Sequence, residues 1–137
     1  MAVITEGIKT YDDASLCFGD YTVKEKLKVD GFEFGGNIYK VKTHDEITRL
    51  EKNGKLLLES VPGSAIHNFI IDEKNVSFCA EGNEDTQITL ELEPSTEYTV
   101  FISGVNTGKM KTNLSGKINF SVELNHTDQE IVIKKVV

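Results

Sequence analysis

Apolar and polar residues alternate one by one along several segments of this chain, and this period of two is the feature that most constrains its fold. The clearest case is the segment 116–124, where every second position is apolar: Ile118, Phe120, Val122 and Leu124. Successive side chains of a strand point to opposite faces, so this pattern predicts a strand with one buried and one solvated face. The same alternation predicts strands over 76–80, 87–93 and 98–102, and an apolar run predicts a last strand at 131–133. Phe101 lies on the opposite face from Tyr98, Val100 and Ile102, which predicts that this strand is covered on both sides.

Turn-forming residues separate these segments at short intervals, over 81–85, 94–96, 104–108 and 113–116. Strands spaced by about 8–12 residues with such turns between them are typical of an all-β sandwich or barrel. The sequence therefore predicts an all-β fold, an antiparallel β-sandwich of immunoglobulin-like or jelly-roll-like type.

The segment 43–53 admits two interpretations. Thr43 and Glu46 have the spacing of a capping box, which would begin a short helical turn. Alternatively, a strand at 47–51 pairs with one at 55–59 across Asn53-Gly54, and Asn-Gly is the strongest short hairpin signal. We favour the hairpin, because the helical alternative has too small an apolar stripe.

The first 36 residues are patterned less regularly, and we expect them to form an extended N-terminal β arm or hairpin. Gly35-Gly36 is the expected hinge between this arm, residues 1–36, and a sandwich body, residues 37–137. The arm would pair with a sheet edge of its own or of a neighbouring subunit. Its apolar positions are Ile4, Ile8, Leu16, Phe18 and Val23. Homo-oligomerisation, or binding of another protein, follows as a prediction.

Composition excludes several classes of function. The formal net charge is -7, which argues against binding of nucleic acid through charge, and no apolar run approaches the roughly 18 residues needed to insert into a membrane. The first residues lack the pattern of a secretory signal, so the expected location is cytoplasmic, or extracellular if the chain is an excised domain of a longer exported protein. Cys17 and Cys79 are too few for a disulfide framework and are expected to be reduced thiols.

Acidic residues concentrate between Asp72 and Glu97, where eight acids accompany one base. Glu81, Glu84 and Asp85 are candidate calcium ligands, since hard cations take several carboxylate oxygens from a loop. The favoured alternative is a solvated face with ordinary turn residues, because the spacing of a calcium-binding loop is missing. The three histidines lack metal-ligand spacing, and 61–65 lacks the glycines of a nucleophile elbow, so Ser64 is expected to be a turn residue. We expect no cofactor and no catalytic residue.

Two aromatic residues stand beside acids and are candidate ligand-binding positions. Tyr11 precedes Asp12 and Asp13, and Tyr21 follows Asp20. Flat aromatic rings next to carboxylates suit sugar recognition by β-sandwiches. In the alternative interpretation these residues only hold the arm in place.

The segment 92–120 carries a strand-turn-strand-turn-strand pattern. It contains Leu92-Glu93-Pro94, Tyr98-Thr99-Val100, Gly108-Lys109 and Gly116-Lys117-Ile118. In this it resembles the small immunoglobulin-like β-sandwich accessory modules of bacterial carbohydrate-active and surface proteins. The resemblance implies a sandwich without catalytic residues, used for spacing, adhesion or ligand contact.

The sequence thus favours a non-catalytic binding or assembly module, acting through its arm and sheet edges on itself or on a protein partner. The alternative is a carbohydrate-binding accessory module of a bacterial surface or polysaccharide-processing system, with a glycan as ligand. An enzyme is the weakest class, because the adjacent Asp12 and Asp13 would point apart on a strand and cannot form an acid–base pair by themselves.

Overall fold

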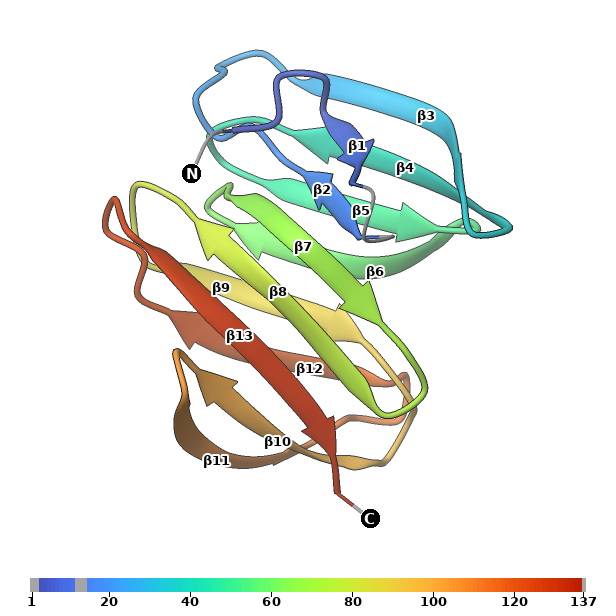
Figure 1. Ribbon diagram of the computed structural model, residues 1–137, viewed down its shortest axis with the longest axis vertical. Coiled ribbons are helices and arrows are strands. Elements are labelled where there is room, and N and C mark those ends of the chain that lie inside the picture. The colour runs from blue at the N-terminus through green and yellow to red at the C-terminus, as the bar shows by residue number, and fades with distance from the viewer. Residues whose placement is uncertain (1–2, 12–14, 137) are drawn as a thin grey trace.

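The computed structural model describes residues 3–11 and 15–136 and shows an all-β chain (Figure 1). Every strand pairing in it is antiparallel. The strands are β1 (Ile8–Thr10), β2 (Leu16–Phe18), β3 (Leu27–Phe34), β4 (Asn37–Thr43), β5 (Thr48–Lys52), β6 (Lys55–Val61), β7 (Ala65–Ile71), β8 (Asn75–Glu81), β9 (Thr86–Glu91), β10 (Glu97–Ile102), β11 (Val105–Lys111), β12 (Lys117–Val122) and β13 (Asp128–Lys135).

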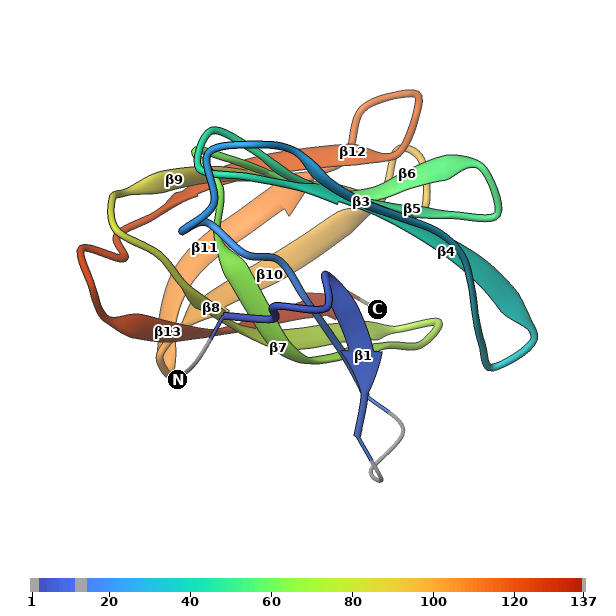
Figure 2. The ribbon, with the colours of Figure 1, turned by 90° about the horizontal axis from the view of Figure 1, so that it is seen from above.

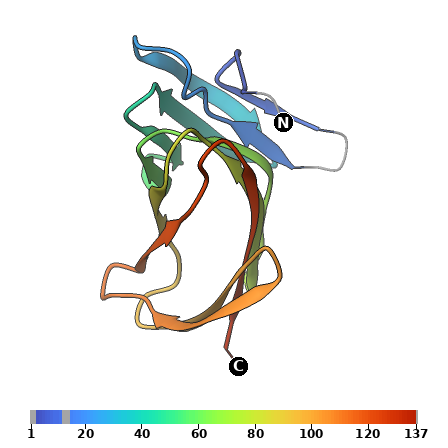
Figure 3. The same ribbon diagram turned by 90° about the vertical axis from the view of Figure 1, so that its left-hand side faces the viewer.

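The strands form two sheets that pack face to face, as the side view in Figure 3 shows. One sheet has seven strands in the order β1-β2-β7-β8-β13-β10-β11, and the other has six in the order β12-β9-β6-β5-β4-β3. The alternating apolar residues meet between the sheets, where Phe18, Phe69 and Phe78 are among the largest fully buried side chains. The predicted antiparallel β-sandwich is confirmed.

The hairpin interpretation of 43–53 is also confirmed. β5 pairs with β6, with Lys52 opposite Lys55 at the turn. Asn53 and Gly54 form this turn with φ angles of 52° and 82°, which are left-handed values that Asn and Gly adopt more readily than other residues.

Three strands, β4, β7 and β11, lie where the sequence pattern predicted none. In β7 the register with β8 shifts between His67 and Ile70, and Asn68 has a φ of 54°, so a bulge breaks the alternation. The turn predicted over 104–108 is wrong for most of that segment, because β11 begins at Val105. Nearly every side chain of β11 is exposed, so the sequence of this edge strand shows no alternation of apolar and polar residues.

The expected division into arm and body is not confirmed. β2 pairs with β7 of the same chain, and Ile4, Ile8, Leu16 and Phe18 are at most 3% exposed within this sandwich. Gly35 and Gly36 form the turn of the β3–β4 hairpin inside the six-stranded sheet. The N-terminal strands bury too much apolar surface in the chain's own core to stand apart from it. Figure 2 shows β1 in the layer that contains β7, across from β3 and β4.

Candidate functional site

A cleft of about 620 Å³ opens at one end of the sandwich, where four loops meet. These loops join β2 to β3, β4 to β5, β6 to β7 and β8 to β9. The residues that line the cleft are Tyr21, Lys24, Asp45, Glu46, Val61, Pro62, Gly63, Asn83 and Glu84. Each loop therefore contributes to the cleft, and the fixed ends of the strands determine its shape.

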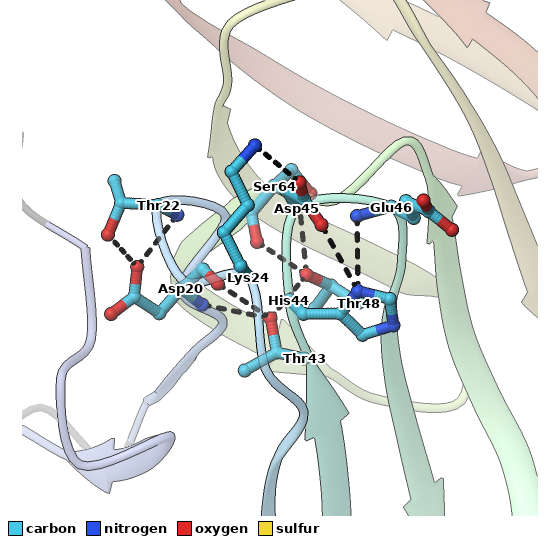
Figure 4. Close-up of polar contacts among 9 residues, drawn as sticks. All are labelled: Asp20, Thr22, Lys24, Thr43, His44, Asp45, Glu46, Thr48 and Ser64. Atoms are coloured by element: carbon cyan, nitrogen blue, oxygen red, sulfur yellow. Dashed lines mark hydrogen bonds and ion pairs between the residues drawn. The ribbon is translucent and has the colours of Figure 1, made fainter.

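A chain of buried hydroxyl groups holds three of these loops together (Figure 4). Thr43 and Thr48 are fully buried, and their Oγ1 atoms lie 2.8 Å apart. Thr48 Oγ1 donates to the Ser64 carbonyl at 2.8 Å and accepts from the Ser64 N–H at 3.1 Å. The Asp20 N–H donates to Thr43 Oγ1 at 2.9 Å. The loops after β2, β4 and β6 are thus tied to one another beneath the cleft.

The hydroxyl chain continues to the loop that carries Pro62. Ser60 Oγ and Thr86 Oγ1 both donate to the Pro62 carbonyl, at 2.8 Å and 2.7 Å. The Val61-Pro62 peptide bond is cis. Next to it, the Gly63 N–H donates to the Asp45 carbonyl at 3.0 Å, and a Cβ at position 63 would overlap the carbonyl oxygen of His44. Only glycine allows the loops after β4 and β6 to approach this closely.

Charged groups form the rim on the β4–β5 side. Lys24 Nζ lies 3.1 Å from Asp45 Oδ2, and His44 Nδ1 lies 3.3 Å from Asp45 Oδ1. Hydrogen bonds from Lys24 and then from His44 hold the pKa of the Asp45 carboxyl below its ordinary value of 3.8. Asp45 is therefore ionised at neutral pH, which makes it a hydrogen-bond acceptor toward a ligand.

Tyr21 borders the cleft on the β2–β3 loop. Burial, followed by the charges of Glu81 and Asp20, raises the pKa of its phenol. The hydroxyl therefore stays protonated at neutral pH and can donate a hydrogen bond. Asp20 itself is 3% exposed, and its Oδ1 accepts from the backbone N–H of Thr22 at 2.9 Å and from its hydroxyl at 2.5 Å. Asp20 thus shapes the loop that presents Tyr21.

The aromatic–acid positions predicted from the sequence do not form one surface. Tyr11 follows β1, and its N–H donates to the Ser15 carbonyl at one end of the β1–β2 hairpin. Tyr21 lies just beyond Phe18, the last residue of β2, and so at the opposite end of this hairpin. At that end the Gly19 N–H donates to the Gly7 carbonyl. Asp12 and Asp13 lie outside the described residues. Of the candidate ligand-binding residues that the structure describes, Tyr21 is the one that lines the cleft.

The candidate calcium ligands are also separated. Within residues 3–11 and 15–136, no three His, Cys, Asp or Glu side chains lie close enough together to hold a metal ion, and this includes Glu81, Glu84 and Asp85. Glu84 lines the cleft, Glu81 ends β8 beside Tyr21, and Asp85 is exposed just before β9. The described residues therefore do not assemble the candidate calcium site, and the alternative of a solvated face with ordinary turn residues remains the favoured interpretation.

Sequence reasoning missed much of the cleft. Lys24, Asp45 and Glu46 belong to loops whose convergence depends on the order of strands in the two sheets. Pro62-Gly63 gave a local signal, because this dipeptide predicts a turn, but nothing in it indicates which other loop it contacts.

The free edges of both sheets are protected against added strands. β3 carries exposed Lys28, Asp30 and Glu33, and its register with β4 shifts after Val29. Edge charges and bulges of this kind discourage pairing with a further strand. β11 presents lysines and a register shift, and β1 has only three residues.

The remaining edge strand, β12, is capped by the turn that precedes it. Asn113 Oδ1 accepts from the Lys117 N–H at 2.9 Å, and the Asn113 N–H donates to the Lys117 carbonyl at 3.1 Å. These contacts occupy the backbone groups with which an added strand would pair at that end of β12.

Comparison of the chain with protein-family models, with curated proteins and with solved structures gave no match. The resemblance of residues 92–120 to immunoglobulin-like accessory modules therefore stays a prediction. The described part of the chain contains no helix that is long and apolar enough to cross a membrane.

Proposed function

We propose that this chain is a non-catalytic binding module that holds a short, uncharged oligosaccharide in the cleft between its four loops. The observation that carries this proposal is the composition of the cleft lining. It combines an aromatic ring, Tyr21, with the carboxylate of Asp45 and the amide of Asn83 around an open volume of about 620 Å³. Binding sites for small ligands commonly have volumes of roughly 300–1,000 Å³.

The chemistry of a sugar matches each part of this lining. The hydroxyl groups of a sugar donate to carboxylates and both donate to and accept from an amide. The C–H face of a sugar ring packs on flat aromatic or aliphatic surface, which Tyr21, Val61 and Pro62 supply. Val61 is 46% exposed, so part of its apolar side chain is accessible to a ligand in the cleft.

The charge of the cleft favours a neutral ligand over an anionic one. Asp45, Glu46 and Glu84 outnumber the lone base of the lining, Lys24, which is already paired with Asp45. An acidic sugar would meet this excess of negative charge. The paired, ionised Asp45 also acts better as a fixed acceptor than as a proton donor, which fits binding rather than acid catalysis.

The arm and the sheet edges support a binding function less well than the cleft does. Exposing Ile4, Ile8, Leu16 or Phe18 to a partner would remove buried side chains from the core. Full exposure of one such side chain costs about 1.5–3 kcal/mol. The edges carry charges, bulges and a cap, as described above.

A binding screen followed by calorimetry tests the proposal. The full chain would be applied to an array of neutral and acidic oligosaccharides, and the best ligand titrated into the wild type and into Tyr21→Ala and Glu84→Gln variants. Loss of the Tyr21 ring or of the Glu84 carboxylate is expected to weaken binding about tenfold, a change equivalent to 1.4 kcal/mol. Tyr11→Ala is the matched control, because Tyr11 is exposed but lies at the far end of the β1–β2 hairpin.

Two results would contradict the proposal. One is the absence of binding to every neutral oligosaccharide on the array. The other is an equal loss of affinity in Tyr11→Ala and Tyr21→Ala, which would place the ligand outside the cleft.

A further inference from the structure

The outer face of the seven-stranded sheet carries three apolar side chains, Phe101, Val132 and Ile70, in one row that also contains Ser77; we call it the apolar row. Phe101 on β10 pairs in register with Val132 on β13, Val132 pairs with Ser77 on β8, and Ser77 pairs with Ile70 on β7. Residues directly opposite one another across antiparallel strands point to the same face. Phe101 and Val132 are half-buried and Ile70 is 44% exposed.

Charges of opposite sign flank this row on its two sides. On β13, Lys134 lies two residues after Val132, and Glu130 lies two residues before it. Both are exposed. On the lysine side, Lys134 and Lys109 both pair in register with Thr99, so two lysines share that row. On the acid side, Asp128 lies two residues before Glu130 on the same strand.

Lys134 leans toward the apolar row, because its Nζ lies 5.5 Å from the centre of the Phe101 ring. Figure 1 looks onto this face, with β8 and β13 in front. The sequence pattern predicted that β10 would be covered on both sides. The chain's own fold covers the side of Tyr98 and Val100, whereas Phe101 keeps part of its surface accessible.

We infer that this face binds the same face of a second copy of the chain, in a two-fold symmetric dimer. A two-fold axis that runs along the apolar row reverses the direction of the strands. It therefore sets the lysine side of one copy against the acid side of the other, while the apolar row meets itself. Lys134 then faces the second copy's Glu130, and symmetry provides this contact twice. A parallel arrangement would instead place like charges together.

The dimensions of the face fit a weak dimer. Four strands spaced about 4.8 Å apart and about seven residues long cover roughly 20 Å by 24 Å per copy. Together the two copies would bury about 1,000 Å², which is near the lower limit for a specific interface. The inference concerns a different surface from the cleft, so each proposal stands or fails without the other.

Sedimentation and light scattering of the full chain over about 10 μM to 1 mM test the dimer, with charge reversals as probes. Lys134→Glu and Glu130→Lys each place like charges together at both symmetric contacts, and each is expected to raise the dimer dissociation constant about tenfold. The double variant, Lys134→Glu with Glu130→Lys, restores opposite charges and is expected to dimerise as the wild type does.

The controls are Lys117→Glu and Glu33→Lys, which make the same changes in charge at exposed positions on the six-stranded sheet. Thermal melting of every variant confirms that the sandwich is intact. A wild type that is monomeric up to 1 mM would overturn the inference. So would a dimer that tolerates both single reversals, or a double variant that dimerises no better than the single ones.

Discussion

Replacing Thr48 by Val removes the centre of the buried hydroxyl chain and tests whether that chain stabilises the loop end of the sandwich. Val has nearly the shape of Thr, so the core volume is kept. The substitution takes away the acceptor of the Ser64 N–H at 3.1 Å and the donor to the Ser64 carbonyl at 2.8 Å. It also removes the 2.8 Å contact with Thr43, whose hydroxyl keeps the Asp20 carbonyl as an alternative acceptor at 3.4 Å.

Two groups of Ser64 therefore lose their partners in a site with no exposed surface. A buried group left without a partner costs about 1–3 kcal/mol, so we expect the free energy of unfolding to fall by about 2–4 kcal/mol. Urea denaturation followed by circular dichroism measures this loss directly. A domain of this size has a total stability of about 5–15 kcal/mol, so the change is large enough to measure with confidence.

Thr89→Val is the matched control for this prediction. Thr89 Oγ1 accepts from the Asn119 side chain at 2.6 Å on the solvated face of the six-stranded sheet. Water replaces that partner, so a loss of less than about 0.5 kcal/mol is expected. If Thr48→Val costs no more than Thr89→Val, the hydroxyl chain does not stabilise the sandwich and the reasoning is wrong.

Two further predictions concern the cleft. The depressed pKa of Asp45 means that its contribution to stability is present above the ordinary carboxyl value of 3.8 and is lost as the pH falls through the lower value of the folded state. Asp45→Asn should therefore be less stable than the wild type in urea melts at pH 7, with a difference that shrinks below pH 3.8; a difference that persists at lower pH would contradict this. Gly63→Ala should lower the free energy of unfolding by about 1–3 kcal/mol, because its Cβ would displace the His44 backbone. Gly82→Ala should cost less, since its Cβ would meet the movable Leu124 side chain at 3.0 Å, and an equal loss in the two variants would refute the close-approach argument.

The strands that could be predicted from the sequence are those with a regular alternation. β12 and β9 pair without a bulge and bury every second residue, so their pattern survives intact in the sequence. β7 and β11 could not be predicted in this way. A bulge at Asn68 shifts the phase of β7, and β11 contributes almost nothing to the core.

The cleft was harder to predict than the fold, for a physical reason. Tyr21 was identified because an aromatic residue beside an acid is a local signal. Asp45 and Gly63 lie 18 positions apart, and what unites them is a backbone hydrogen bond from the Gly63 N–H to the Asp45 carbonyl. Such a contact depends on which strands are neighbours, and alternation along one strand carries no information about its neighbours.

The pairing of β2 with β7 also has a consequence for how the chain folds during its synthesis. Leu16 lies opposite Phe69, so the first strands leave the ribosome more than fifty residues before the strand that completes their surroundings. Long-range pairing of this kind slows folding, and until it is made the N-terminal apolar side chains stay accessible to chaperones or to other nascent chains.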